Sequence, residues 1–153
     1  MPEIFSNVIQ SDAIELMNNI RINLGRTGTT ATNETQHSLR QETKQEGLKY
    51  KMQMFGRPFF MTVETGRKPT PEKKPSRQMI DRIKLWCDAR GIDESAAWAI
   101  ATKINKQGTE LWRKGGREDI VTPAINEFQN SVSQHLLDAA ADEFIVKIRE
   151  LQW

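Results

Sequence analysis

The sequence predicts an α+β fold in a single domain of residues 1–153, with a small antiparallel sheet packed against helices and a long C-terminal helix. Two patterns lead to this fold class. Apolar residues recur at helical spacing in several stretches, whereas around residues 48–54 they alternate with polar residues at the period of a β-strand. Because a chain of this length supports one modest core, a second domain is not expected.

The composition is that of a protein with extensive polar surface. Apolar residues make up 37% of the chain, charged residues 27%, and the mean hydropathy is -0.62. These values favour an elongated or assembled protein over a compact monomer. The single cysteine, Cys87, excludes a disulfide within the chain and favours a reducing compartment. It lies on an apolar helical stripe, so we expect a small core residue rather than a nucleophile.

The charges are unevenly distributed, although the net charge is only +2. Residues 1–65 hold seven basic and seven acidic side chains, residues 66–117 hold thirteen and six, and residues 118–153 hold two and seven. The middle segment therefore carries +7 and the C-terminal segment -5. This separation predicts that the two segments meet, either within one chain or between neighbouring molecules.

Residues 11–24 are predicted to form a helix. Asp12 and Glu15 have the spacing of a capping box, and Gly25 suits a left-handed residue after the helix end. Residues 25–36 contain no large apolar side chain, so we expect an exposed, mobile loop there. The helical stripe expected to be buried consists of Ala13, Met17, Ile20 and Leu24.

A sheet is predicted at about residues 37–65. The alternation at residues 48–54 indicates a half-buried strand, and the preceding segment is expected to pair with it through a short turn with Gly47 at positive φ. The apolar run at residues 58–63 is compatible with a third strand or with a buried turn of helix. Periodicity does not distinguish these two alternatives.

Residues 66–75 are predicted to form an extended basic connector, because three prolines remove backbone donors and disfavour helix. Such an exposed arm can contact phosphate, an acidic protein surface or only water. The candidate interface cations on this connector and around the later Gly115-Gly116 break are Arg67, Lys68, Lys73, Lys74, Arg77, Arg113, Lys114 and Arg117.

Two helices are predicted at residues 76–90 and 93–107, with Gly91 ending the first in a Schellman motif. A helix pair of this kind is also the outline of a helix-turn-helix DNA-binding motif. Here the second helix would enter the groove with Asp93 and Glu94 leading, and phosphate would repel both side chains. Plain helix packing is therefore favoured.

The last helix is predicted at about residues 122–152, with Thr122 as its cap and Pro123 at the first helical position. No glycine or further proline follows within it. At 1.5 Å per residue it would span roughly 45 Å, which is longer than a compact domain of this size requires.

No catalytic motif is present in the sequence. It contains no nucleophile elbow, phosphate-binding loop, zinc-protease or EF-hand pattern, so we expect neither an enzyme nor a cofactor. One set of side chains on the last helix has spacing compatible with a cation site. With one histidine and no second ligand cluster, an ordinary polar face is favoured over a metal site at His135, Asp138 and Asp142.

The middle of the chain resembles the tail-completion or neck proteins of tailed bacteriophages, particularly those of gut phages. The resemblance lies in VETGRKPTPEKKP, then IDRIKLWCDARGI, then AWAIATKINKQGTELWRKGG, in that order and over about fifty residues. The positions that carry it, and which the resemblance marks as structural motif residues, include Glu64, Gly66, Arg67, Pro69, Trp86, Gly91 and Gly108.

This resemblance implies a structural virion protein without catalytic activity. It would be one subunit of a ring in the neck or tail connector, joining the portal side of the head to the tail around the DNA channel. Implied partners are further copies of itself, virion proteins of the portal, adaptor or tail, and packaged DNA through non-specific contacts. The implied location is the virion, after synthesis in the cytoplasm of the bacterial host.

The alternative from the residues alone is a small nucleic-acid-binding module. It would use the basic connector and the helix pair hinged at Gly91, and it predicts DNA binding with a steep dependence on salt.

Overall fold

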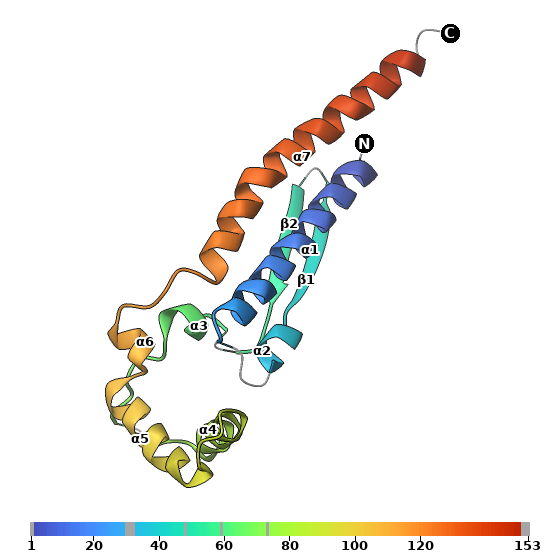
Figure 1. The fold of residues 1–153 in the computed structure, drawn as a ribbon. Coiled ribbons are helices and arrows are strands. Elements are labelled where there is room, and N and C mark those ends of the chain that lie inside the picture. The colour runs from blue at the N-terminus through green and yellow to red at the C-terminus, as the bar shows by residue number, and fades with distance from the viewer. Residues whose placement is uncertain (1, 30–32, 48, 59, 73, 151–153) are drawn as a thin grey trace.

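The computed structural model describes residues 2–29, 33–47, 49–58, 60–72 and 74–150. Long helices are combined with one two-stranded antiparallel sheet, which confirms the predicted α+β class (Figure 1). No helix within these described ranges is both long and apolar enough to cross a membrane.

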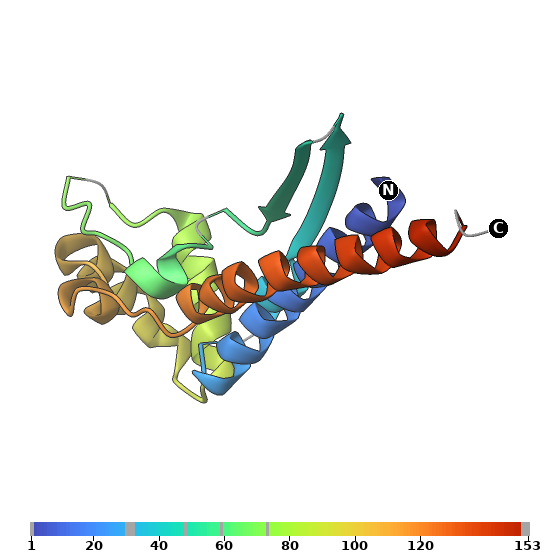
Figure 2. The same ribbon diagram turned by 90° about the horizontal axis from the view of Figure 1, so that it is seen from above.

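Helices α1 (Pro2–Arg26) and α7 (Val121–Glu150) pack side by side and antiparallel (Figures 1 and 2). The stripe predicted in the first helix is buried in this contact. The predicted start at residue 11 is wrong, because the helix already begins at Pro2 and Asp12 lies within it, buried. The capping-box spacing of Asp12 and Glu15 therefore marks no helix end.

The hairpin consists of β1 (Arg40–Glu46) and β2 (Lys49–Phe55), paired so that Thr43 lies opposite Met52. Its turn contains Gly47 at φ +63°, as predicted. One face of the hairpin packs on α1, and Met52 and Met54 contact the core. The alternating pattern thus predicted both the strand and its buried side.

The predicted loop at residues 25–36 is shorter than expected at both ends. Helix α1 continues to Arg26, and a short helix, α2 (Glu34–His37), begins before residue 36; residues 30–32 lie outside the described part. Polar contacts anchor this region in place of apolar burial. Gln36 Nε2 donates to the Arg21 carbonyl at 2.9 Å, and Arg21 Nη2 donates to the Leu39 carbonyl at 2.8 Å.

The apolar run at residues 58–63 forms no strand in the described structure, since the sheet there has two strands. It leads instead into a one-turn helix, α3 (Thr62–Thr65). The sheet predicted to reach residue 65 therefore ends at Phe55, and the helical alternative for this run was the better one.

After the connector come α4 (Arg77–Ala89), a 3-10 turn η1 (Glu94–Ala96), α5 (Ala97–Gln107) and α6 (Glu110–Arg113). Helices α4 and α5 form a separate hairpin below α3 (Figure 1). Gly91 has φ +66°, and the amide of Ile92 donates to the Cys87 carbonyl at 2.8 Å, so the Schellman ending is confirmed. Cys87 is fully buried, as predicted.

The main core lies between α1, α7 and the base of the hairpin. Partly buried side chains from β2 and from the segment around α3 complete it. The buried residues that form it are Leu16, Met17, Ile20, Leu24, Leu39, Ile120, Val121 and Ala124. Ile120 precedes α7 and Val121 is its first residue, so the burial of these two side chains fixes the position of the helix start. Glu64, a residue of the family-like pattern, binds the backbone at this point.

Candidate functional site

Two segments that are distant in sequence, residues 64–70 and residues 105–117, lie against each other in a structure that we call the clasp. The amide of Thr109 donates to the Arg67 carbonyl at 2.9 Å, and the amide of Arg67 donates to Thr109 Oγ1 at 2.9 Å. The amide of Thr70 donates to the Asn105 carbonyl at 2.7 Å. The first and last parts of the family-like pattern therefore form one hydrogen-bonded unit.

Two glycines allow the clasp to close. Gly66 has φ +70° and Gly108 has φ +74°, both in the left-handed region. A Cβ at Gly66 would lie 2.3 Å from the backbone nitrogen of Trp112, and one at Gly108 would lie 2.8 Å from the Arg67 carbonyl oxygen. Both the backbone angle and the close approach of the second segment thus require glycine.

Glu64 connects the clasp to the start of α7. Its carboxylate is buried, with 6% of the residue exposed, and Oε1 accepts from the amides of Ile120 (3.0 Å), Val121 (2.5 Å) and Thr122 (3.3 Å). The next residue, Pro123, has no amide hydrogen. Every donor at the helix start is thereby satisfied or absent, and the negative charge lies at the positive end of the helix dipole.

This arrangement corrects the prediction for the start of the last helix. The helix begins at Val121, so Thr122 lies inside the first turn and does not cap it. The cap comes instead from Glu64, a residue of α3 far away in the sequence. The Glu64 carbonyl also accepts from the Arg117 amide at 2.9 Å, which ties the segment before α7 to the same residue.

Arg67 is exposed, but its side chain is engaged in the clasp and does not extend from it as a free basic arm. Its guanidinium donates to Asn105 Oδ1 at 3.5 Å and lies 3.1 Å from Met79 Sδ. Asn105 is buried at the end of α5 and Met79 is buried in the first turn of α4. Arg67 therefore links the two helices of the hairpin to the clasp. Sequence reasoning missed Asn105, because a lone asparagine near a helix end carries no local signal of burial.

The other predicted cations fall into two groups. Arg113 donates to Gln107, Lys114 pairs with Glu110, and Arg117 makes a two-pronged pair with Asp119. Hydrogen bonds from Arg117 hold the pKa of Asp119 below its usual value. The second group has no ion pair among the described residues and comprises Lys68, Lys74 and Arg77; Lys73 lies outside that description.

A groove of about 940 Å³ runs between the clasp, α4 and the segment around α2. We call it the basic groove. Trp86, a motif residue, lies here rather than in the clasp and is partly exposed, as is Trp112. Its apolar lining includes Phe60, Met79, Ile83, Trp86, Ile104 and Trp112. Its cationic side chains are Arg57, Arg67, Lys68 and Arg82, and Arg57 is paired with Glu34.

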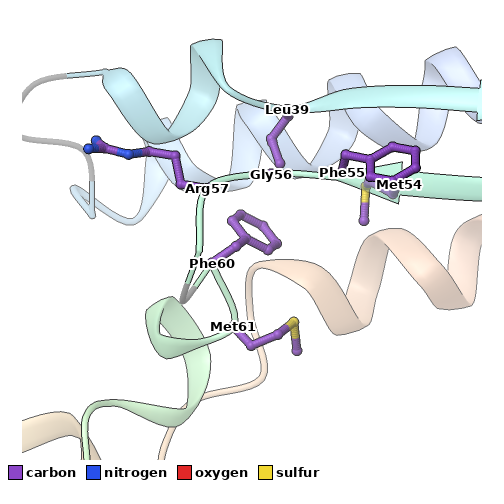
Figure 3. A pocket seen from close by; sticks show the side chains of 7 residues that line it. All are labelled: Leu39, Met54, Phe55, Gly56, Arg57, Phe60 and Met61. Carbon is purple, nitrogen blue, oxygen red and sulfur yellow. The ribbon is translucent and has the colours of Figure 1, made fainter.

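A second, smaller cavity of about 480 Å³ lies where the hairpin meets α3 (Figure 3). Leu39, Met54 and Phe60 line it with apolar atoms, whereas the Arg57 side chain points away from them. It offers no group suited to acid-base or nucleophilic chemistry. We assign no function to this cavity.

The predicted polar set on the last helix does not converge on one point. His135 Nδ1 lies 2.7 Å from Oδ1 of the buried Asp12 on α1, and Asp138 accepts from Gln134. Across the described residues, no three metal-binding side chains come together. The pair of His135 and Asp12 instead joins α1 to α7.

The helix pair of α4 and α5 presents acidic side chains where a recognition helix would meet DNA. Asp93 accepts from the Ser95 amide at 2.7 Å, and this hydrogen bonding lowers the pKa of Asp93. Glu94 follows it in the 3-10 turn. Asp93 and Glu94 therefore place negative charge at the N-terminal end of α5.

Comparison with known proteins adds no assignment: neither a protein-family model, nor a curated protein, nor a solved structure matches this chain.

Proposed function

We propose that this protein is a structural subunit of a ring in the neck or tail connector of a tailed bacteriophage, joining the portal side of the head to the tail around the DNA channel. The observation that carries the proposal is the clasp. Glu64, Gly66, Arg67 and Gly108, which carry the resemblance to neck proteins, each have a defined structural task within it. Because the residues that resemble the neck-protein motif hold the fold together, the resemblance supports a neck-protein architecture. These structural contacts require no catalytic role.

The surface of the molecule supports an assembled state. Large apolar side chains are exposed on α7, on α4 and at the edge of the basic groove. Exposed apolar surface of this kind is typical of protein–protein contacts. A head-to-tail contact around a ring joins two different surfaces, and the +7 middle segment and the -5 C-terminal segment supply charges of opposite sign for such a contact.

The test is the assembly of particles by a phage that carries this gene. With an amber codon early in the gene, we expect DNA-filled heads and separate tails to accumulate in a non-suppressing host, and joined particles to return in a suppressing host. Electron microscopy of the lysates distinguishes these products. Joined, infectious particles at normal yield without the protein would overturn the proposal.

The alternative is a nucleic-acid-binding module. Lys68, Lys74 and Arg77 favour it, because no acidic side chain of the described structure pairs with them. It predicts retardation of duplex DNA by the purified protein, with a log-log salt slope of about -3 if those three cations contact phosphate. No retardation at low salt would remove this alternative.

A further inference from the structure

Helix α7 has a second apolar stripe that no part of the described chain covers. It consists of Leu137, Ala141, Phe144 and Ile148, and we call it the exposed stripe. Its spacing of four, three and four residues places the four side chains in one line along a helix. Leu137 and Phe144 are each 66% exposed.

The exposed stripe lies on the side of α7 that faces away from α1. His135, which contacts Asp12 of α1, precedes Phe144 by about two and a half helical turns, and this places the two side chains on opposite sides of the helix. Figures 1 and 2 show the last turns of α7 projecting past the start of α1. A line of exposed, large apolar side chains at the free end of a helix is typical of a protein–protein contact.

The part of α7 that bears the exposed stripe is acidic overall. Residues 137–150 hold the acids Asp138, Asp142, Glu143 and Glu150 and the bases Lys147 and Arg149. Asp138 lies beside the stripe, about 100° around the helix from Leu137, and is exposed. The basic groove has a complementary lining: apolar side chains that include Trp86 and Trp112, and cationic side chains that include Lys68 and Arg82. A helix with an exposed apolar line in an acidic segment can bind a groove that combines apolar and cationic side chains.

The chain cannot place its own stripe in its own groove. Helix α7 has 30 residues, and its N-terminal end is held by Glu64 close to the groove. Its last turns therefore lie roughly 20 to 45 Å from that end, at the opposite side of the molecule (Figure 1). The exposed stripe can therefore enter only the groove of a second molecule.

We infer that the exposed stripe of one copy docks in the basic groove of the next copy, with Asp138 facing a cationic side chain of the groove. This inference rests on the proposed ring function and names the contact that would build the ring. Stripe and groove are different surfaces, so each copy offers one of each. Such a head-to-tail contact repeats from copy to copy and closes into a ring when the rotation permits.

Disulfide cross-linking between two single-cysteine variants tests this contact. Both carry Cys87→Ala, which removes the native thiol; one adds Ala141→Cys in the stripe, the other Gln78→Cys in the groove. We expect cross-linked dimers in the mixture and not in either variant alone. Cross-linking of Ala141→Cys alone would show pairing of two α7 helices and overturn the inference. The control partner is Asp88→Cys, an exposed position outside the groove, which should give no dimer.

Light scattering over a concentration series gives the second readout. Replacing Leu137 and Phe144 together by serine should raise the concentration at half-association by about tenfold or more. Trp98→Ser, at a residue 63% exposed on α5 and outside the groove, should leave it unchanged. Equal effects of the two variants, or a protein that stays monomeric at all concentrations, would overturn the inference.

The two proposals fail separately. A ring that forms without the mixed cross-link overturns the stripe-in-groove contact and leaves the ring function standing. A mixed cross-link in a protein whose loss does not disturb head-tail joining overturns the neck function and leaves the contact standing.

Discussion

Glu64 is the residue on which the helix α7 depends most directly. One buried carboxylate oxygen accepts from three consecutive amides at the helix start. Glu64→Ala leaves these donors buried without an acceptor, and we expect it to lower the free energy of unfolding by about 3 kcal/mol. Glu64→Gln keeps an acceptor but loses the charge, so a smaller loss of about 1 kcal/mol is expected. Urea denaturation measures both.

Thr122→Ala is the matched control for the capping role of Glu64. Sequence reasoning assigned the cap to Thr122, whereas the structure places this residue within the first turn. Its substitution should change the free energy of unfolding by less than about 0.5 kcal/mol. If Thr122→Ala were as costly as Glu64→Ala, the assignment of the cap to Glu64 would be wrong.

Gly66 and Gly91 provide a second comparison between single residues. Both have left-handed backbone angles, but a Cβ at Gly91 meets nothing within 4 Å, whereas one at Gly66 meets the backbone of Trp112. We expect Gly91→Ala to cost about 1 to 2 kcal/mol from the backbone angle alone. Gly66→Ala should cost about 3 kcal/mol or more, because the clasp must also open. Equal midpoints of thermal unfolding for the two variants would contradict the close approach.

The residues that sequence reasoning placed correctly act locally. Gly91 ends α4 as predicted, and the Ile92 amide donates to the Cys87 carbonyl, so this contact spans only a few positions. Glu64 stands more than fifty residues before the helix it caps, and no pattern around residue 64 or residue 120 indicates the other. The resemblance marked Glu64 as part of a motif, but only the folded chain shows that Glu64 caps α7.

At the scale of elements, the contact between α1 and α7 depends on a polar pair as well as on apolar packing. Asp12 is buried, and its Oδ2 has no hydrogen-bond partner among the described residues. Its other oxygen bonds to His135. Removal of the histidine would leave the whole carboxylate buried without a partner, and this is more costly than the loss of an exposed hydrogen bond.

His135→Ala is therefore expected to lower the free energy of unfolding by about 2 kcal/mol. A double-mutant cycle with Asp12→Ala should give a coupling energy of about 1 kcal/mol or more, since the two side chains touch. Gln134→Ala, the neighbouring exposed position on α7, serves as the control and should cost less than about 0.5 kcal/mol. A coupling energy near zero would show that the pair contributes nothing to the docking of α1 on α7.

The pattern of successes among the elements has a physical explanation. The hairpin was predicted because its alternation directly reflects one buried face, and Met52 and Met54 lie on that face. The run at residues 58–63 was ambiguous because a short, mostly apolar segment suits either a strand or a helical turn. The start of α1 was placed too late because Asp12 was taken as a helix cap. Asp12 lies inside α1 instead, where it is buried and contacts His135 of α7.

At the scale of the whole molecule, the sequence predicted the separation of charge but not its geometry. The basic middle and the acidic end are visible in a count of residues. The basic groove exists only because the clasp brings residues 64–70 against residues 105–117 and turns α4 toward them. The sequence analysis placed the interface cations on the connector and around the Gly115-Gly116 break. It missed Arg82, which lines the groove from α4.

The charge separation predicts how assembly responds to salt. The triple variant Lys73→Glu, Lys74→Glu and Arg77→Glu should weaken the association of copies, because its connector would repel the acidic segment of a neighbour. The remaining association should depend less on salt, since fewer favourable charge contacts are left to screen. Sedimentation velocity between roughly 50 and 500 mM salt, a range over which the screening length falls severalfold, measures both effects.

A matched variant separates the position of the charges from their number. Lys44, Lys49 and Lys51 lie on the exposed hairpin, and their replacement by glutamate changes the net charge of the chain by the same amount. If the connector faces an acidic neighbour, only the connector variant loses its salt dependence, while the hairpin variant associates as the native chain does. If both variants lose association equally, net charge alone governs it. An unchanged connector variant across the salt series would show that the connector faces solvent, and the ring contact would then depend on the groove and on α7 without it.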